Sequence, residues 1–163
     1  MAQEYSFDVV SQFDRQELVN AVNQAQREIA TRYDFKDTGA SIELGSDAIT
    51  LHGPSDFKLK SMLDVLQGKL VRRQLSLKIL KPGAIEPAAR GTVRQTLTLQ
   101  EGLSDELARD LVKQIKQVSP KVQPRIQGDT IRVSSREKDL LQQVIQTLKD
   151  VDTPVPLQFI NYR

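Results

Sequence analysis

Arginine, lysine and tyrosine side chains in a few short segments are the groups of this chain best suited to chemistry. Arg94, Arg125 and Arg132 lie in segments where apolar and polar residues alternate, which predicts strands with these arginines on the polar side. A guanidinium binds phosphate through paired hydrogen bonds and stacks on flat rings. We therefore expect the three arginines to contact phosphates, the alternative being a solvated sheet face.

Two further segments combine aromatic and basic residues. The first reads RYDFK at Arg32–Lys36, and the second is the C-terminal pair Tyr162 and Arg163. Aromatic and charged residues interleaved in a loop are typical of a ligand-binding edge. Tyr33 and Phe35 can equally complete a hydrophobic core. The candidate ligand contacts from these segments are Arg32, Tyr33, Phe35, Lys36, Tyr162 and Arg163.

A basic stretch runs from Lys58 to Lys81, where seven Lys or Arg residues stand against one acid, Asp64. Such a stretch attracts phosphate-bearing ligands, although a solvated helix face has the same appearance. Lys69, Arg72 and Arg73 are its candidate contacts. They do not form a phosphate-binding P-loop, because the glycine that precedes such a loop is missing.

Catalysis and metal chemistry have little support in the sequence. The chain has one histidine, His52, and no cysteine. Disulfides, thiolate metal sites and a cysteine nucleophile are therefore excluded, and the usual zinc patterns are missing. We expect a protein that is not an enzyme and that has no metal site and no cofactor.

The elements expected to position these residues form the same pattern twice, in the order strand, helix, hairpin, helix, strand. Apolar residues recur every three or four positions in the helices and every two in the strands. The first copy comprises Ser6–Val10, Asp14–Arg32, Ser41–Leu44, Ala48–His52, Ser55–Arg72 and Leu75–Leu80. The second comprises Thr92–Gln100, Asp105–Val118, Val122–Gln127, Thr130–Ser134, Arg136–Lys149 and Leu157–Ile160.

This repeat predicts an α+β fold made of two ferredoxin-like domains, each a four-stranded antiparallel sheet with two helices on one face. Lys81–Gly91, rich in Pro, Gly and Ala, is expected to be a connector. Two topologies satisfy the pairing rules. In a simple tandem the domains are 1–82 and 91–163. With exchanged first strands, strand 92–100 completes a domain spanning 14–102, and 1–13 joins 103–163.

Composition gives broad limits. The chain has 163 residues, 39% hydrophobic and 27% charged, with a net charge of +2. These values are ordinary for a soluble globular protein. No signal-peptide pattern and no membrane-length apolar run is present, so we expect a cytoplasmic protein without a membrane partner.

Several segments in order resemble the YajQ family of small bacterial proteins. The resemblance rests on RYDFK at Arg32–Lys36, KLKSMLDVLQGKLVRR at Lys58–Arg73 and GTVRQ at Gly91–Gln95. It continues through KVQPRIQGDTIRV at Lys121–Val133 and PLQFINYR at Pro156–Arg163. The chain departs from the family at Ser134–Asp139, where the family tends to have a basic run after a glycine.

The resemblance implies two ferredoxin-like domains with exchanged first strands and a nucleotide-binding protein without known catalysis. Some members look like cyclic di-GMP effectors, and a link to RNA is inferred for the family from its likeness to RNA-recognition modules. Three functions are therefore carried forward. They are binding of a nucleotide such as GTP, ATP or cyclic di-GMP, binding of a tRNA-like RNA by the basic surface, and binding of a protein partner or a second copy through exposed edges of the second hairpin strands.

Overall fold

The computed structural model describes residues 3–163, so residues 1 and 2, which the expected domain boundaries include, lie outside the described residues. The chain folds into two compact units. The central unit is Phe13–Gln100, and the terminal unit combines the segment that ends at Gln12 with Glu101–Arg163. Each has one four-stranded antiparallel sheet, which confirms the expected α+β class with a duplicated ferredoxin-like arrangement.

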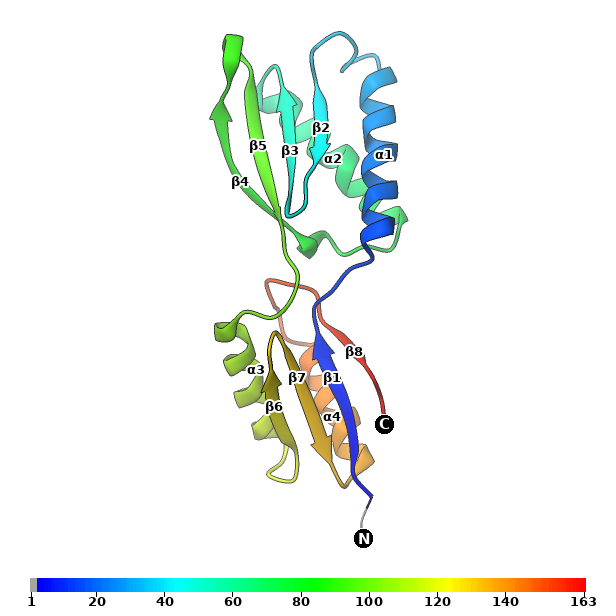
Figure 1. Ribbon diagram of the computed structural model, residues 1–163, viewed down its shortest axis with the longest axis vertical. Coiled ribbons are helices and arrows are strands. Elements are labelled where there is room, and N and C mark those ends of the chain that lie inside the picture. The colour runs from blue at the N-terminus through cyan, green and yellow to red at the C-terminus, as the bar shows by residue number, and fades with distance from the viewer. Residues whose placement is uncertain (1–2) are drawn as a thin grey trace. The chain divides into compact units, whose positions relative to one another are not determined.

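The central unit has a sheet with strand order β2-β3-β5-β4 and two helices packed on one side of it (Figure 1). Its helices and strands are α1 (Arg15–Thr31), β2 (Ser41–Leu44), β3 (Ala48–Gly53), α2 (Asp56–Arg72), β4 (Leu80–Pro87) and β5 (Val93–Leu99). The core between sheet and helices is built from the apolar stripes of α1 and α2 and the inward residues of β3 and β5. The opposite side of the sheet carries polar residues.

The terminal unit has the strand order β6-β7-β1-β8 and also carries its helices on one side (Figure 1). Its elements are β1 (Tyr5–Val10), α3 (Asp105–Val118), β6 (Gln123–Gln127), β7 (Thr130–Ser135), α4 (Lys138–Lys149) and β8 (Gln158–Ile160). Phe7, Val9, Ile131 and Val133 point into its core and are fully buried. Period-2 alternation therefore places Ser6, Asp8, Arg132 and Ser134 on the face without helices.

The helices begin where short polar residues satisfy the first free amides. The Asp14 carboxylate accepts hydrogen bonds from the amides of Gln16 and Glu17, at 2.9 and 3.2 Å. Ser55 and Ser104 cap α2 and α3 in the same way. Helix α4 begins at Lys138, two residues after the expected start, because the Ser135 hydroxyl binds the amide of Glu137 and holds that residue in an extended conformation.

The first strands are exchanged between the two units. Strand β1 pairs with β7 and β8, both from the other end of the chain. Strand β5 pairs with β3 and β4, which precede it in the sequence. Both exchanged strands are inner strands of their sheets.

The last strand of the first copy differs from the expectation. Leu77–Ile79 forms a short 3-10 helix, and β4 runs from Leu80 to Pro87, so the strand expected at Leu75–Leu80 and the connector expected at Lys81–Gly91 are both wrong. Pro82 is tolerated because β4 is an edge strand, and a bulge follows it before Ile85. The true turn is short, at Ala88–Thr92, with Arg90 and Gly91 at positive φ.

The strand edges also differ from the expectation. The second hairpin strands, β3 and β7, are paired on both sides and offer no free edge. The edge strands are β2, β4, β6 and β8. At one of them the Gln26 side chain of α1 donates to the Ile42 carbonyl of β2 at 2.7 Å, which occupies part of that edge.

Within residues 3–163 no helix combines the length and apolarity that a membrane crossing requires.

Candidate functional site

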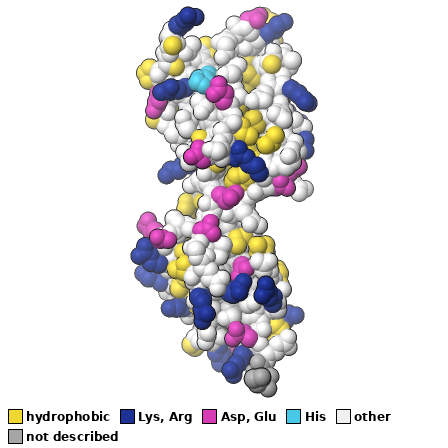
Figure 2. Space-filling view, viewed as in Figure 1, with side chains coloured by type: hydrophobic (Ala, Val, Ile, Leu, Met, Phe, Trp, Pro, Cys, Tyr) yellow, Lys and Arg dark blue, Asp and Glu magenta, His cyan; other side chains and the backbone are white. Residues whose placement is uncertain are grey.

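The polar face of the terminal sheet forms two rows of side chains across its four strands. One row is Arg125, Arg132, Asp8 and Ile160, set by the register of the strands. The next row is Gln123, Ser134, Ser6 and Arg163. Figure 2 shows Lys and Arg side chains gathered over the strands that Figure 1 labels β6, β7 and β1. We call these two rows, together with Asn161, the arginine face.

Arg125 and Arg132 stand directly opposite each other on β6 and β7. Like charges in this position destabilise a strand pair unless another charge balances them. Arg132 has such a partner in Asp8, whereas Arg125 is exposed and has no ion pair or side-chain hydrogen bond among the described residues. The face therefore offers one guanidinium that is free to bind an anion and a second one beside it.

Asp8 is the balancing carboxylate and lies at the centre of the face. Its Oδ1 accepts from Arg132 Nε at 3.0 Å, and its Oδ2 accepts from Asn161 Nδ2 at 2.8 Å. The hydrogen bond from Arg132 lowers the pKa of this largely buried carboxyl, and the Asn161 bond and the charge of Arg163 act in the same direction. The same ion pair raises the pKa of Arg132, so both groups are charged at neutral pH.

The C-terminal residues divide between the two sides of the sheet. Asn161 adopts a positive φ of 59°, a conformation that asparagine tolerates well, and its side chain reaches Asp8 on the open face. Arg163 pairs through its backbone with Ser6, at 3.0 and 3.2 Å, so its side chain belongs to the arginine face. Tyr162 stacks on Phe7 at 6.1 Å and stays 60% exposed. The predicted residues Arg125, Arg132 and Arg163 are thus brought together, and Tyr162 lies beside them.

The polar face of the central sheet carries balanced charges. Arg94 pairs with Glu86 at 3.2 Å, and the His52 imidazole lies 4.0 Å from Glu43. Arg94 lies on β5, in the other unit from Arg125 and Arg132. Its charge is already compensated by Glu86.

Three of the predicted basic residues meet between the helices of the central unit. Arg32, Lys69 and Arg72 line a cavity of about 270 Å³ together with Glu28 and Asp64. Lys69 lies 3.0 Å from Glu28 and, through this hydrogen bond, lowers the pKa of that carboxyl. Arg73 makes a further pair with Glu17 at 3.5 Å. Two cations of the basic stretch, Lys69 and Arg73, thus pair with acids of α1.

The RYDFK segment is split between core and surface. Phe35 is 2% exposed and lies in the core, with Arg32 and Lys58 over its ring at 5.2 and 5.4 Å. It is therefore not accessible to a ligand. Tyr33, in contrast, is 96% exposed, and Lys36 is exposed as well. The bond from Lys58 Nζ to the Asp34 carbonyl, 2.6 Å, ties this loop to the start of α2.

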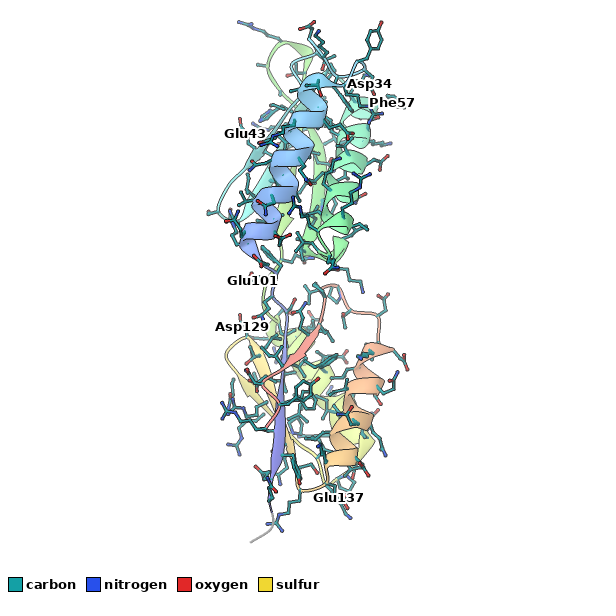
Figure 3. The ribbon with its side chains drawn as sticks, turned by 90° about the vertical axis from the view of Figure 1, so that its right-hand side faces the viewer. Asp34, Glu43, Phe57, Glu101, Asp129 and Glu137 are labelled. Atoms are coloured by element: carbon teal, nitrogen blue, oxygen red, sulfur yellow. The ribbon has the colours of Figure 1, made fainter. Side chains whose placement is uncertain are left out.

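An unexpected second aromatic lies at the same end of the central unit. Phe57, in the first turn of α2, is 73% exposed, and Figure 3 shows it close to Asp34 where α1 ends and α2 begins. Two large exposed aromatic side chains, Tyr33 and Phe57, therefore share this end of the unit. No motif in the sequence singles out Phe57, because a phenylalanine in a helical turn is compatible with burial.

Other parts of the surface are less suited to an anion. A cavity of about 750 Å³ on α3 is lined by equal numbers of acids and bases, Glu106, Asp110, Arg109 and Lys113, with three neutral residues. Across residues 3–163 no group of three or more His, Cys, Asp and Glu side chains is placed to hold a metal ion. The arginine face is the better candidate because its cations exceed its acids.

Comparison with known proteins finds one family along nearly the whole chain. A family model described as nucleotide-binding protein YajQ-like matches residues 5–163. A nucleotide-binding protein of Synechococcus elongatus is 55% identical over 163 residues, the full length of both chains. One of Trichodesmium erythraeum is 54% identical over the same span, and one of Koribacter versatilis is 51% identical over 158 residues, 97% of this chain and 96% of the relative.

Proposed function

The chain belongs to the YajQ-like nucleotide-binding protein family, and on this basis we propose that it binds a nucleotide on the arginine face without transforming it. The observation that carries the proposal is the direct cross-strand pair of Arg125 and Arg132, of which only Arg132 has an acid partner among the described residues. An anion between the two guanidinium groups removes the repulsion between them.

The ligand class is a purine nucleotide or a cyclic dinucleotide such as cyclic di-GMP, bound in a regulatory role. The forked N–H donors of arginine can bind two phosphate oxygens at once, whereas the lysine ammonium acts as a point charge. The strand positions of the face carry no aromatic side chain, so a base has to be held by hydrogen bonds and by guanidinium stacking. Arg163, whose charge already acts on Asp8, supplies a third cation.

RNA binding by the central unit is the second candidate. The exposed rings of Tyr33 and Phe57 favour it, because aromatic side chains stack on unpaired bases. The exposed Lys36 and Lys60 flank these rings in sequence and are suited to the phosphate backbone. The two candidates use different units, so variants of one site leave the other intact.

Calorimetric titration separates the candidates. The protein is titrated with GTP, ATP, cyclic di-GMP and a tRNA mixture, each at two salt concentrations. Nucleotide binding at one site per chain with a shallow salt dependence supports the first. Binding of tRNA alone supports the second, if the logarithm of the binding constant falls against the logarithm of the salt concentration with a slope of about 0.7–0.9 per phosphate contact. If none of these ligands binds, the ligand proposals fail and a protein partner becomes the leading function.

A further inference from the structure

We propose that the cavity between the β6–β7 hairpin and the start of α4 receives the nucleoside of the ligand while its phosphates lie on Arg125 and Arg132. This inference rests on the proposed function and specifies where the two parts of the nucleotide bind. It assigns a role to residues such as Arg136, which belong neither to the sequence motifs nor to the Arg125–Arg132 pair.

The cavity has a volume of about 450 Å³ and is lined by Glu4, Lys121, Gln123, Ser134, Ser135, Arg136 and Glu137. Figure 3 shows Glu137 at the end of the unit where β7 passes into α4. The volume lies within the range of 300–1,000 Å³ that is usual for small-molecule sites. We call it the α4 cavity.

The α4 cavity is continuous with the arginine face. Gln123 and Ser134 belong to both, since they form the cross-strand pair next to Arg125 and Arg132 on the same face of the sheet. Two residues along a strand span roughly 7 Å. A ligand whose phosphates lie between the arginines can therefore extend over Gln123 and Ser134 into the cavity.

The chemistry of the lining fits a nucleoside better than a second phosphate. Its two cations are matched by two carboxylates, and Lys121 already pairs with Glu137 at 3.4 Å. The other lining groups are the Gln123 amide and two serine hydroxyls, which can donate and accept hydrogen bonds, the Arg136 guanidinium, which donates, and the Glu4 carboxylate, which accepts. Ribose hydroxyls and base edges need this mixture, whereas a phosphate needs donors alone.

Arg136 is the residue best placed to hold the base. It is exposed and has no ion pair or side-chain hydrogen bond among residues 3–163. A free guanidinium at the cavity can stack on a base, and this compensates for the lack of an aromatic side chain on the strands.

Two tyrosine substitutions on β7 form a matched test. Ser134→Tyr places a large side chain at the mouth of the α4 cavity. Thr130→Tyr places the same side chain on the same strand and face, at the end away from the cavity. Tyrosine is well accepted in strands, so both variants are expected to fold, and circular dichroism checks this. The probes are ADP, GDP and pyrophosphate, which share a diphosphate and differ in the nucleoside.

The wild-type protein is expected to bind at least one of the two nucleotides about tenfold more tightly than pyrophosphate. Ser134→Tyr is expected to remove this advantage, so that the nucleotides bind no more tightly than pyrophosphate does, while Thr130→Tyr is expected to keep the wild-type advantage. Arg136→Ala, which changes an exposed side chain, is expected to weaken nucleotide binding severalfold without an effect on pyrophosphate.

Two different results would overturn the inference, one of which leaves the proposed function standing. If Ser134→Tyr and Arg136→Ala bind the nucleotide normally while loss of Arg125 and Arg132 abolishes binding, the nucleoside lies elsewhere and the proposed function stands. If the wild-type protein binds neither ADP nor GDP nor any nucleotide of the wider panel, the proposed function fails and the inference fails with it.

Discussion

Asp8 and Arg132 lie 124 residues apart in the sequence and form an ion pair across β1 and β7, with Arg132 Nε 3.0 Å from Asp8 Oδ1. The exchange of the first strand makes this pair possible, because β1 is the strand beside β7. A carboxylate from one end of the chain thus orients an arginine near the other. The arginine face exists only when the terminal unit contains both chain ends.

The Asp8–Arg132 pair predicts a loss of stability in acid. Since the pKa of Asp8 is lower in the folded than in the unfolded protein, its contribution is complete above the unfolded pKa of about 3.9. That contribution disappears as the pH falls through the folded pKa. Urea unfolding between pH 7 and pH 3 should show the free energy of unfolding decreasing below about pH 4.

Asp8→Asn should reduce this dependence on pH and lower the stability at pH 7 by about 1–3 kcal/mol, since it removes hydrogen bonds to a charged group. Asp47→Asn, which changes an exposed carboxylate of the central unit, serves as the control. Equal acid dependence in the Asp8→Asn and wild-type proteins would contradict a stabilising role for this ion pair.

Gly68 should be replaceable with a gain in stability. It lies inside α2, four residues before the last residue of the helix, and a Cβ built on it meets no atom within 4 Å apart from its neighbouring helix backbone. Gly68→Ala is expected to raise the free energy of unfolding by up to about 1 kcal/mol, because alanine is the better helix former. Gly53→Ala is the contrast, since its Cβ would lie 3.1 Å from the side chain of the buried Leu59. Denaturant unfolding should show the free energy of unfolding raised in Gly68→Ala and lowered in Gly53→Ala.

Phe35 and Tyr33 should differ strongly in their effects on stability, although they are separated by one residue. Phe35→Ala removes a buried ring and is expected to cost about 3–5 kcal/mol. Tyr33→Ala changes an exposed side chain, and its effect should stay within about 0.5 kcal/mol. Thermal unfolding compares them directly. A stable Phe35→Ala variant would show that this ring is not part of the core.

The sequence predicts the helices and most strands well because their periodicity is local. Strand β4 was not predicted, because it has no such local periodicity. Pro82 and Gly83 have the local signature of a connector, yet the strand is held by pairing with β5 and by the bond from Gln95 Nε2 to the Gly83 carbonyl at 2.9 Å. Such long-range pairing has no signal in the segment itself.

The candidate site was only partly predictable for a similar reason. The alternating pattern places Arg125 and Arg132 on one polar face, and the hairpin register follows from the short Gly128–Asp129 turn. Asp8 and Asn161 were missed because their role depends on which strands lie beside β1. Had β1 been placed next to β7 at the outset, the polar position of Asp8 in its strand would have indicated Arg132 as its partner.

Phosphate binding by the arginine face is tested by calorimetric titration of the Arg125→Ala/Arg132→Ala double variant with the nucleotide that the wild-type protein binds. Its control is Arg94→Ala, which removes a paired arginine from the polar face of the other sheet. We expect the double variant to bind at least tenfold more weakly, a loss of roughly 1.4 kcal/mol, and Arg94→Ala to bind normally. Unchanged affinity in a folded double variant would contradict the claim that the arginine face holds the phosphates.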